Sequence, residues 1–357
     1  MAPGAIVIVE VERGEAEPSP VRRKEQNALA VGPLACVEIL GRSTLERTLQ
    51  QLAAAEVEVI TVLAAGDVDC ERPAAPASVR LQFRRVPDVP AALAQTIRQY
   101  AEMGIAHTFV LSANVYAETD LLDFFYFHRG AGNAVTRPRD QEGPLNWWMV
   151  DCAKVGTSQS EHLLQAGEQI APSYFVAGYV RRMNHPEEIR RLATDALAAR
   201  CALRPSGKEV RPGVWVDEGA YLDRRSRLVA PLYIGRNAKI GEDALITRSS
   251  SVERNCQVDY GTVIEDSSLL AHTHVGIWLD VRHAVATGNR IWSLEHEVLL
   301  EISDPAIMRS NLSRKEPVST SEPVERESET AVQEFEEEKE KAPAPEAWQL
   351  GANPIQG

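Results

Sequence analysis

The segment that decides the fold of the second half of the chain is Tyr233-Ile-Gly-Arg-Asn-Ala-Lys-Ile-Gly-Glu-Asp-Ala-Leu-Ile246. Its aliphatic residues recur at every sixth position, whereas an α-helix requires a period of about 3.6 residues and a half-buried strand a period of about 2. The spacing continues in both directions, and the aliphatic positions are Val216, Leu222, Leu228, Ile234, Ile240, Ile246, Val252, Val258, Ile264 and Leu270. The residues four positions further on are mostly small. The pattern predicts a left-handed parallel β-helix over residues 216–275, with aliphatic residues inside and small residues at tight corners.

The first 200 residues alternate between strand-like and helix-like segments. Residues 5–9 are apolar and mostly β-branched, as in a buried strand. Ser43-Thr-Leu-Glu46 is a capping box that begins a helix, and Pro90 and Gly104 stand at the start and end of another. This alternation is typical of an α/β layer fold. We therefore expect an α/β domain over residues 1–205 and a β-helical domain with terminal strands over residues 206–303.

The composition limits the possible partners and compartment. The chain has 357 residues, a formal charge of -13 and a pI of about 5.2. This acidity argues against nucleic acid and anionic membrane surfaces as partners, because both attract a basic face. Five scattered cysteines without a CxxC pair give little support to a disulfide or a metal site, and they favour a reducing compartment. Residues 5–9 form too short an apolar run for a signal segment or a membrane span, so we expect a cytoplasmic protein.

The composition changes again at Asp304. From there to the end, 12 acidic residues stand against 6 basic ones, and large apolar residues are few. Such a segment cannot bury enough surface to offset the entropy of ordering it. We therefore expect a disordered, dispensable acidic tail over residues 304–357.

Several segments of the first half resemble a known family in the same order. Pro33-Leu-Ala-Cys-Val-Glu-Ile-Leu-Gly-Arg-Ser-Thr-Leu45 is similar to the stretch P-K-A-L-V-P-V-L-G-R-P-L of sugar-phosphate nucleotidyltransferases, and Phe109-Val-Leu-Ser-Ala-Asn-Val115 resembles the strand that ends in their N-G-D motif. Gly178-Tyr-Val180 and His185-Pro-Glu-Glu188 resemble their G-Y-W and T-P-E-D segments. Many members join a Rossmann-like domain to a hexapeptide-repeat β-helix, and they convert a nucleoside triphosphate and a sugar 1-phosphate into a nucleotide sugar and pyrophosphate. The resemblance implies this fold and a role in sugar-nucleotide or surface-polysaccharide metabolism.

The family's catalytic positions depart from the pattern. Its glycine-rich phosphate loop is replaced by Glu10-Val-Glu12-Arg-Gly-Glu15-Ala-Glu17, whose carboxylates repel a triphosphate. Its lysine falls on Leu34, and the metal-binding aspartate of its N-G-D motif falls on Asn114. Phosphoryl-type transfer depends on positioning and charge neutralisation. We therefore expect weak or lost catalysis, with no catalytic or metal-binding residue and a binding or subunit role.

Three groups remain as candidate substrate-binding residues: Asn114, Asp151 as a second carboxylate, and the cationic cluster Arg22, Arg23 and Lys24. The expected ligand is a sugar phosphate or a nucleotide. The expected protein partner is a second copy through the β-helix or a related enzyme.

Two alternatives stay open. One is an active sugar-1-phosphate nucleotidyltransferase with Mg²⁺, whose missing cations come from Arg22, Arg23 and Lys24. The other is a hexapeptide-repeat acyltransferase that uses His272 or His274 between coils. The pair Trp147-Trp148 faces opposite sides of an expected strand, so core packing is its expected role.

Overall fold

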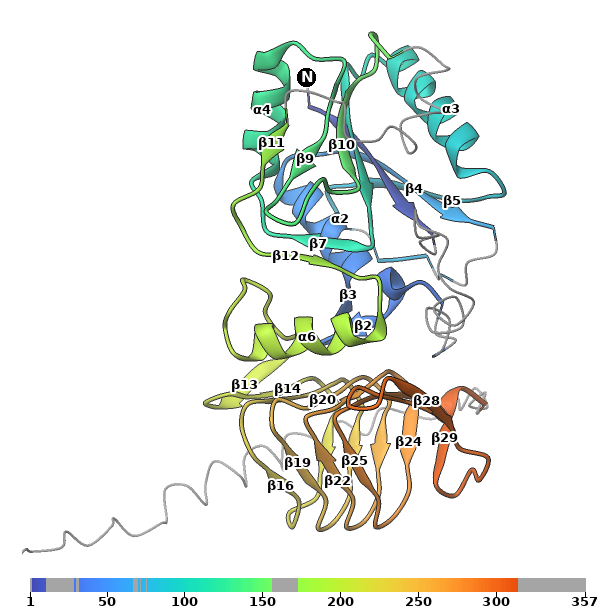
Figure 1. The fold of residues 1–357 in the computed structure, drawn as a ribbon, viewed down its shortest axis with the longest axis vertical. Coiled ribbons are helices and arrows are strands. Elements are labelled where there is room, and N and C mark those ends of the chain that lie inside the picture. Colours follow the sequence, from blue (N-terminus) through green and yellow to red (C-terminus); the bar gives the residue numbers. More distant parts are fainter. Residues whose placement is uncertain are drawn as a thin grey trace, which may run out of the picture. The chain divides into compact units, whose positions relative to one another are not determined.

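The computed structural model describes residues 2–10, 29, 32–66, 70, 72–74, 76–155 and 173–313. They lie within one compact unit that ends at Ser313. The protein is mixed α/β, with a layered N-terminal region (residues 1–205) and a coil region (residues 206–313) (Figure 1). None of the described helices is long and apolar enough to cross a membrane.

A six-stranded sheet forms the centre of the N-terminal region. Its strands, in spatial order, are β5 (Arg80–Val86), β4 (Val59–Ala65), β1 (Gly4–Val9), β6 (His107–Ser112), β10 (Trp147–Asp151) and β8 (Val135–Thr136). The first four are parallel, whereas β10 runs antiparallel to both of its neighbours. The sheet is therefore mixed.

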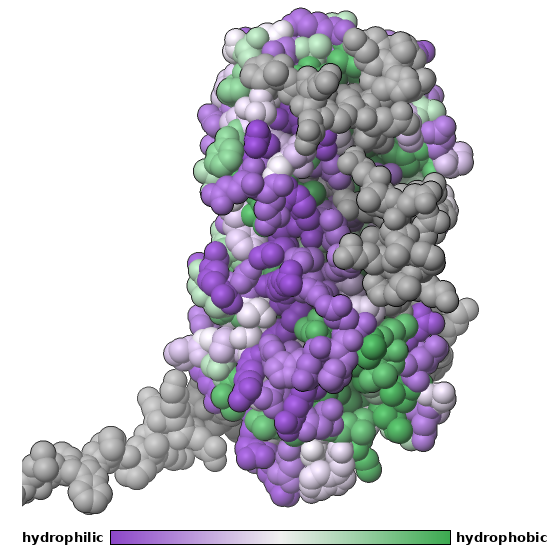
Figure 2. Space-filling model, in the orientation of Figure 1, coloured by the Kyte–Doolittle hydropathy of each residue, from purple (hydrophilic) through white to green (hydrophobic). Residues whose placement is uncertain are grey.

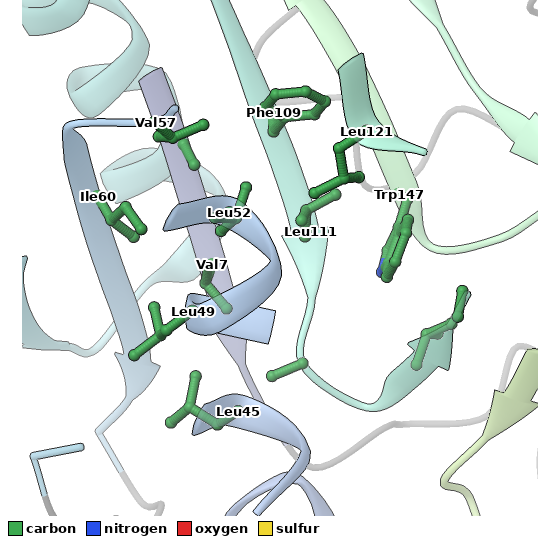
Figure 3. Close-up of a cluster of buried hydrophobic side chains, with 14 of the residues drawn as sticks. Val7, Leu45, Leu49, Leu52, Val57, Ile60, Phe109, Leu111, Leu121 and Trp147 are labelled. Carbon is green, nitrogen blue, oxygen red and sulfur yellow. The ribbon is translucent and has the colours of Figure 1, made fainter. Parts of the chain in front are cut away.

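Helices cover both faces of this sheet. On one face, α2 (Thr44–Ala54) and α4 (Leu121–Ala131) pack on alternate strand residues such as Val7, Leu111 and Trp147 (Figure 3). On the other face, α3 (Val89–Glu102) packs on the intervening residues, which include Ile8 and Trp148. Both tryptophans are core residues on opposite faces, so the prediction for them is confirmed.

Local sequence signals fix the helix ends. The Ser43 hydroxyl accepts from the amide of Glu46 at 3.1 Å, and the Glu46 carboxylate accepts from the amide of Ser43 at 3.0 Å. This reciprocal pair is the predicted capping box of α2. Asp88 caps α3 through the amide of Ala91, one residue after Pro90.

Short elements complete the N-terminal region. They are η1 (Leu34–Cys36), the hairpin β2 (Glu38–Ile39) and β3 (Arg42–Ser43), the antiparallel pair β7 (Val115–Ala117) and β12 (Val180–Arg182), the parallel pair β9 (Pro138–Arg139) and β11 (Tyr174–Phe175), and α6 (Pro186–Leu197).

The coil region consists of three parallel sheets, and consecutive strands fall in consecutive sheets. The first sheet holds β14 (Val214–Val216), β17 (Leu232–Ile234), β20 (Ser251–Val252), β23 (Ser268–Leu269) and β26 (Ala284–Thr287). The second holds β15 (Tyr221–Leu222), β18 (Lys239–Ile240), β21 (Gln257–Val258) and β24 (Thr273–Val275). The third holds β16 (Arg227–Leu228), β19 (Leu245–Thr247), β22 (Val263–Glu265) and β25 (Asp280–Arg282). Antiparallel strands extend these sheets: β13 (Lys208–Arg211), β27 (Arg290–Ser293), β28 (Val298–Glu301) and β29 (Met308–Ser310).

The predicted inward positions of the repeat are confirmed. Ile234, Ile240, Ile246, Val252 and Val258 are at most 1% exposed. Ile234 pairs with Val252, which lies three hexads further along the chain, so one coil uses one strand from each sheet. Residues with positive φ recur at the same spacing, and each directly precedes a buried small residue: Asn237, Asp243, Ser249, Asn255 and Gly261.

The strict hexad register is wrong near its end. Val252 pairs with Leu269 rather than with Leu270, because one turn there is a residue shorter and its positive-φ position falls on Asp266. Leu269 and Val275 consequently fill the interior. Leu270 packs instead in a cluster with α6 residues.

Two other expectations need correction. Strand β29 pairs with β24, and its Met308 is 1% exposed, so ordered structure continues past Asp304 to η2 (Asn311–Ser313). One buried methionine and a free strand edge offset the polar composition of this segment. The remainder of the predicted tail, residues 314–357, lies outside the described residues. Cys36 and Cys70 form a disulfide, which their spacing in the sequence did not suggest.

The surface in Figure 2 is mostly hydrophilic over the N-terminal region, and hydrophobic residues gather over the coil region. Exposed apolar side chains of the coil region include Trp278, Ile277 and Leu312.

Candidate functional site

The parallel part of the six-stranded sheet has a topological switch point. The chain passes from β1 to β4 on one side and then crosses to β6 on the other side. The connections therefore leave the carboxyl ends of β1 and β6 in opposite directions. Ligands of open α/β sheets bind in the crevice at such a point. The residues at these strand ends are Glu10 after β1, Ser112 at the end of β6, Ala113 and Asn114 after it, and Asn146 before β10.

Asn114 lies at this switch point and is 3% exposed. The side-chain NH₂ group of Asn114 donates to the backbone carbonyl of Glu10 at 2.9 Å. The backbone carbonyl of Asn114 accepts from the backbone amide of Met183 at 2.7 Å. Its Oδ1 atom is buried and has no hydrogen-bond partner among the described residues. A buried acceptor without a donor is uncommon and calls for an explanation such as a bound ligand. Asn114 is thus the predicted site residue that the structure places where a ligand is expected.

Asp151 lies at the opposite ends of the strands, near the amino-terminal end of β6. Because β10 is antiparallel to β6, Trp147 pairs with Leu111 near the carboxyl end of β6, and Asp151 pairs with His107 at its beginning. The structure therefore does not bring Asp151 and Asn114 together. The Asp151 carboxylate accepts from the amides of Ala153 and Lys154 at 3.1 and 3.3 Å and pairs with the Lys154 ammonium at 3.1 Å.

These contacts also set the ionisation of Asp151. Burial alone would raise the pKa of this carboxyl, but the ammonium and the two amides outweigh it and lower the pKa below its usual range. Asp151 organises the turn after β10 rather than the switch point.

Arg137 was not among the predicted site residues. It directly follows β8 and lies at the same strand ends as Asn114. Its guanidinium donates to the carbonyl of Leu145 at 2.8 Å and to the side chain of Asn146 at 3.0 Å, and it lies 5.3 Å from the ring centre of Trp148. The carbonyl of Asn146 in turn accepts from the amide of Ser112. Arg137 thus holds the segment beside the switch point, and nothing in the spacing around it indicates this role.

Segment η1 reaches the switch point through Thr44. The Thr44 hydroxyl lies 3.1 Å from the carbonyl of Ala35 and 3.0 Å from that of Ala113, which directly precedes Asn114. Leu34, at the family's lysine position, is 9% exposed and packs in a hydrophobic cluster. The disulfide joins Cys36 of η1 to Cys70, beyond the carboxyl end of β4.

The other predicted phosphate-site residues cannot be placed. Arg22, Arg23 and Lys24 lie outside the described residues, as do Glu12 and Glu15. Within the described ranges, no group of three or more His, Cys, Asp or Glu residues could hold a metal ion.

The histidines considered for acyl transfer lie at the late coils. The Nε2 atom of His274 is 2.7 Å from an oxygen of Asp259, and the His274 side chain is 4% exposed. Strand β29 pairs alongside it through Arg309. His272 occupies a corner with positive φ, and its amide donates to the carbonyl of Arg254. The burial of His274 offers little access to a substrate.

A buried carboxylate connects the N-terminal region to the coil region. Glu253 is 1% exposed and accepts from the amides of Leu40 and Gly41 at 2.8 and 2.9 Å. Its neighbour Arg254 pairs with Glu38 at 2.6 Å. Burial raises the pKa of Glu253 to about 8, although the two amides and Arg47 act in the opposite direction.

Comparison with known proteins adds no assignment to this geometry. No protein-family model matches the chain, and no curated protein matches its sequence. The site is therefore interpreted from its own residues.

Proposed function

We propose that the N-terminal region is a Rossmann-like nucleotidyltransferase fold and that the coil region is a left-handed parallel β-helix. The strand order around β1, with helices on both faces, supports the first part. The β-helix is supported by the three parallel sheets of the coil region, because each coil contributes one strand to each sheet. Together they are the domain pair of sugar-phosphate nucleotidyltransferases, which the motifs of the first half resemble.

The function that we propose is binding of a nucleotide or sugar phosphate at the switch point, with weak or lost catalysis. The Oδ1 atom of Asn114 carries this proposal, because it is a buried acceptor without a partner among the described residues, at the carboxyl ends of the strands where such folds hold ligands. Weak catalysis is supported by two substitutions. Asn114 supplies a neutral amide already bonded to Glu10, and Leu34 is a core residue instead of a cation near the phosphates. Loss of one stabilising group costs about 2.7–4 kcal/mol of transition-state stabilisation in comparable sites.

A binding experiment tests the proposal directly. Nucleoside triphosphates, with and without Mg²⁺, and sugar 1-phosphates are screened for a rise in melting temperature, because a specific ligand stabilises the folded state. Asn114→Ala should abolish the rise. Asn133→Ala is the matched control, since Asn133 precedes β8 at the opposite edge of the same sheet. No rise with any ligand, or equal loss in both variants, would contradict binding at the switch point.

Pyrophosphate release over the same panel tests the catalytic part. We expect no measurable turnover in the wild-type protein or in Asn114→Asp, because the carboxylate alone restores neither the missing lysine nor a phosphate cradle. A wild-type turnover of about 1 s⁻¹ or above lies in the ordinary range for enzymes. That result would favour the active, Mg²⁺-dependent nucleotidyltransferase instead.

For partners, we propose self-association through the coil region or association with a related enzyme. Exposed side chains such as Trp278 and Ile277, which are 69% and 60% exposed, support an interface there. The cytoplasm is the compartment proposed from the sequence, whereas the Cys36–Cys70 disulfide favours an oxidising compartment. The mass of the protein in solution, measured by light scattering with and without the Trp278→Ala substitution, tests self-association.

A further inference from the structure

An open surface cavity of about 310 Å³ lies beside one corner of the coil region. It is lined by Asp266 and His283, which occupy equivalent corners one full coil apart. Leu294 and Glu295, which follow β27, complete the lining. The volume is at the lower end of the range of ligand pockets, which is about 300–1,000 Å³. A ligand of this cavity is therefore small.

The imidazole of His283 is held in one orientation. Its Nδ1 atom is 2.6 Å from Oδ2 of Asp266, and the other oxygen of Asp266 accepts from Arg190 at 2.5 Å. The Arg190 side chain is only 5% exposed and also donates to the carbonyls of Arg248 and Ser249. The His283 backbone is fixed on both sides, by the carbonyl of Glu265 and by the amide of Leu294.

This arrangement determines which imidazole nitrogen is left for a ligand. One oxygen of the Asp266 side chain is engaged by Arg190, and Nδ1 of His283 faces the other oxygen at 2.6 Å. Nδ1 is thus engaged within the protein, and Nε2 is the ring nitrogen that this contact leaves for a ligand. The His283 side chain is 44% exposed, so a ligand can approach it.

The charged side chains around the cavity indicate which class of ligand it can bind. The charge of Asp266 is offset by Arg190, whereas none of the ion pairs between described residues involves Glu295. The cavity thus offers the side chain of Glu295, which has no ion-pair partner among the described residues, the imidazole of His283 and the apolar side chain of Leu294. None of the four lining residues is a lysine or an arginine. Phosphates and carboxylates are disfavoured here, in contrast to the ligands proposed for the switch point.

We propose that this cavity binds a small organic amine. Its ammonium group donates to the Glu295 carboxylate and to Nε2 of His283, and its hydrocarbon part contacts Leu294. The site is separate from the switch point and does not depend on nucleotide binding there.

The test uses the full-length protein and three compounds that share one ring: cyclohexylamine, cyclohexanol and cyclohexanecarboxylate. Calorimetry or ligand-observed NMR measures their affinities. We expect the amine to bind at least about tenfold more tightly than the alcohol, because a charge-assisted hydrogen bond is about twice as strong as a neutral one. We expect no binding of the carboxylate. The ¹⁵N resonance of Nε2 in His283 should shift as the amine is added.

Glu295→Gln removes the charge and keeps the shape of the side chain, and it should weaken binding of the amine by about tenfold or more. Glu297→Gln is the matched control, because Glu297 belongs to the same exposed turn but does not line the cavity. The proposal fails if the amine does not bind at about 10 mM, if the carboxylate binds as well, or if Glu295→Gln and Glu297→Gln behave alike.

Discussion

The buried carboxyl of Glu253 predicts an unusual dependence of stability on pH. In the unfolded chain this group has the ordinary pKa of a glutamic acid, about 4.3, whereas burial raises its pKa to about 8 in the folded protein. The folded state therefore keeps a proton that the unfolded chain releases. The contribution of Glu253 to stability is fully present below the unfolded pKa and is lost as pH rises through the folded pKa.

The size of the loss follows from the two pKa values. For a group with a pKa of about 4.3 when unfolded and about 8 when folded, the free energy of unfolding decreases by about 3 to 4 kcal/mol between pH 5 and pH 8. Other groups titrate in the same interval, so the wild-type curve alone is ambiguous. Glu253→Gln removes this titration and leaves the others, and the difference between the two proteins isolates it.

Urea unfolding of both proteins at pH 5, 6, 7 and 8 provides the measurement. We expect the wild type to lose stability relative to Glu253→Gln by about 3 kcal/mol over this range. An exposed substitution in the same region, Glu218→Gln, should leave the pH dependence unchanged. A difference between wild type and Glu253→Gln that stays flat within about 1 kcal/mol would refute the reasoning. It would mean that the amides of Leu40 and Gly41 keep the group ionised despite its burial.

Three further predictions concern the fold. Ile240→Asp should lower the free energy of unfolding by about 3 kcal/mol or more, because it buries an unpaired charge. Lys239→Asp on the exposed face of the same strand should change the urea midpoint little, and equal midpoints for the two variants would contradict the inward register. A chain ending at Ser313 should keep the melting temperature of the full-length protein, and one ending at residue 303, which lacks β29, should melt lower. A lower melting temperature for the chain ending at Ser313 would show that residues 314–357 stabilise the fold. Cys36→Ser removes a crosslink across 34 residues and should cost about 4 kcal/mol in a chain-entropy estimate; no change would mean that the thiols are free in solution.

The interior of the coil region is predictable because its signal is local and repeated. Each strand places one aliphatic side chain inward. The six-residue spacing of Ile234, Ile240 and Ile246 therefore predicts directly which residues fill the interior. The shift of register near the end is not predictable in the same way. Leu269 and Leu270 are adjacent and both aliphatic, so either can continue the pattern. Only the shortened turn at Asp266 decides between them.

The two sites differ from the repeat because their contacts join distant parts of the chain. The position of Asn114 follows from a motif at the end of a strand, and the sequence was sufficient to find it. Glu253 bonds to the amides of a hairpin that is more than 200 residues away, and backbone amides carry no sequence signature. Arg190, Asp266 and His283 come from one helix and two coil corners. Asp266 and His283 occupy these corners because each follows a turn that is one residue shorter than the hexad, at Asp266 and again at His283. The irregularity that the repeat pattern misses is therefore the feature that builds the proposed amine site.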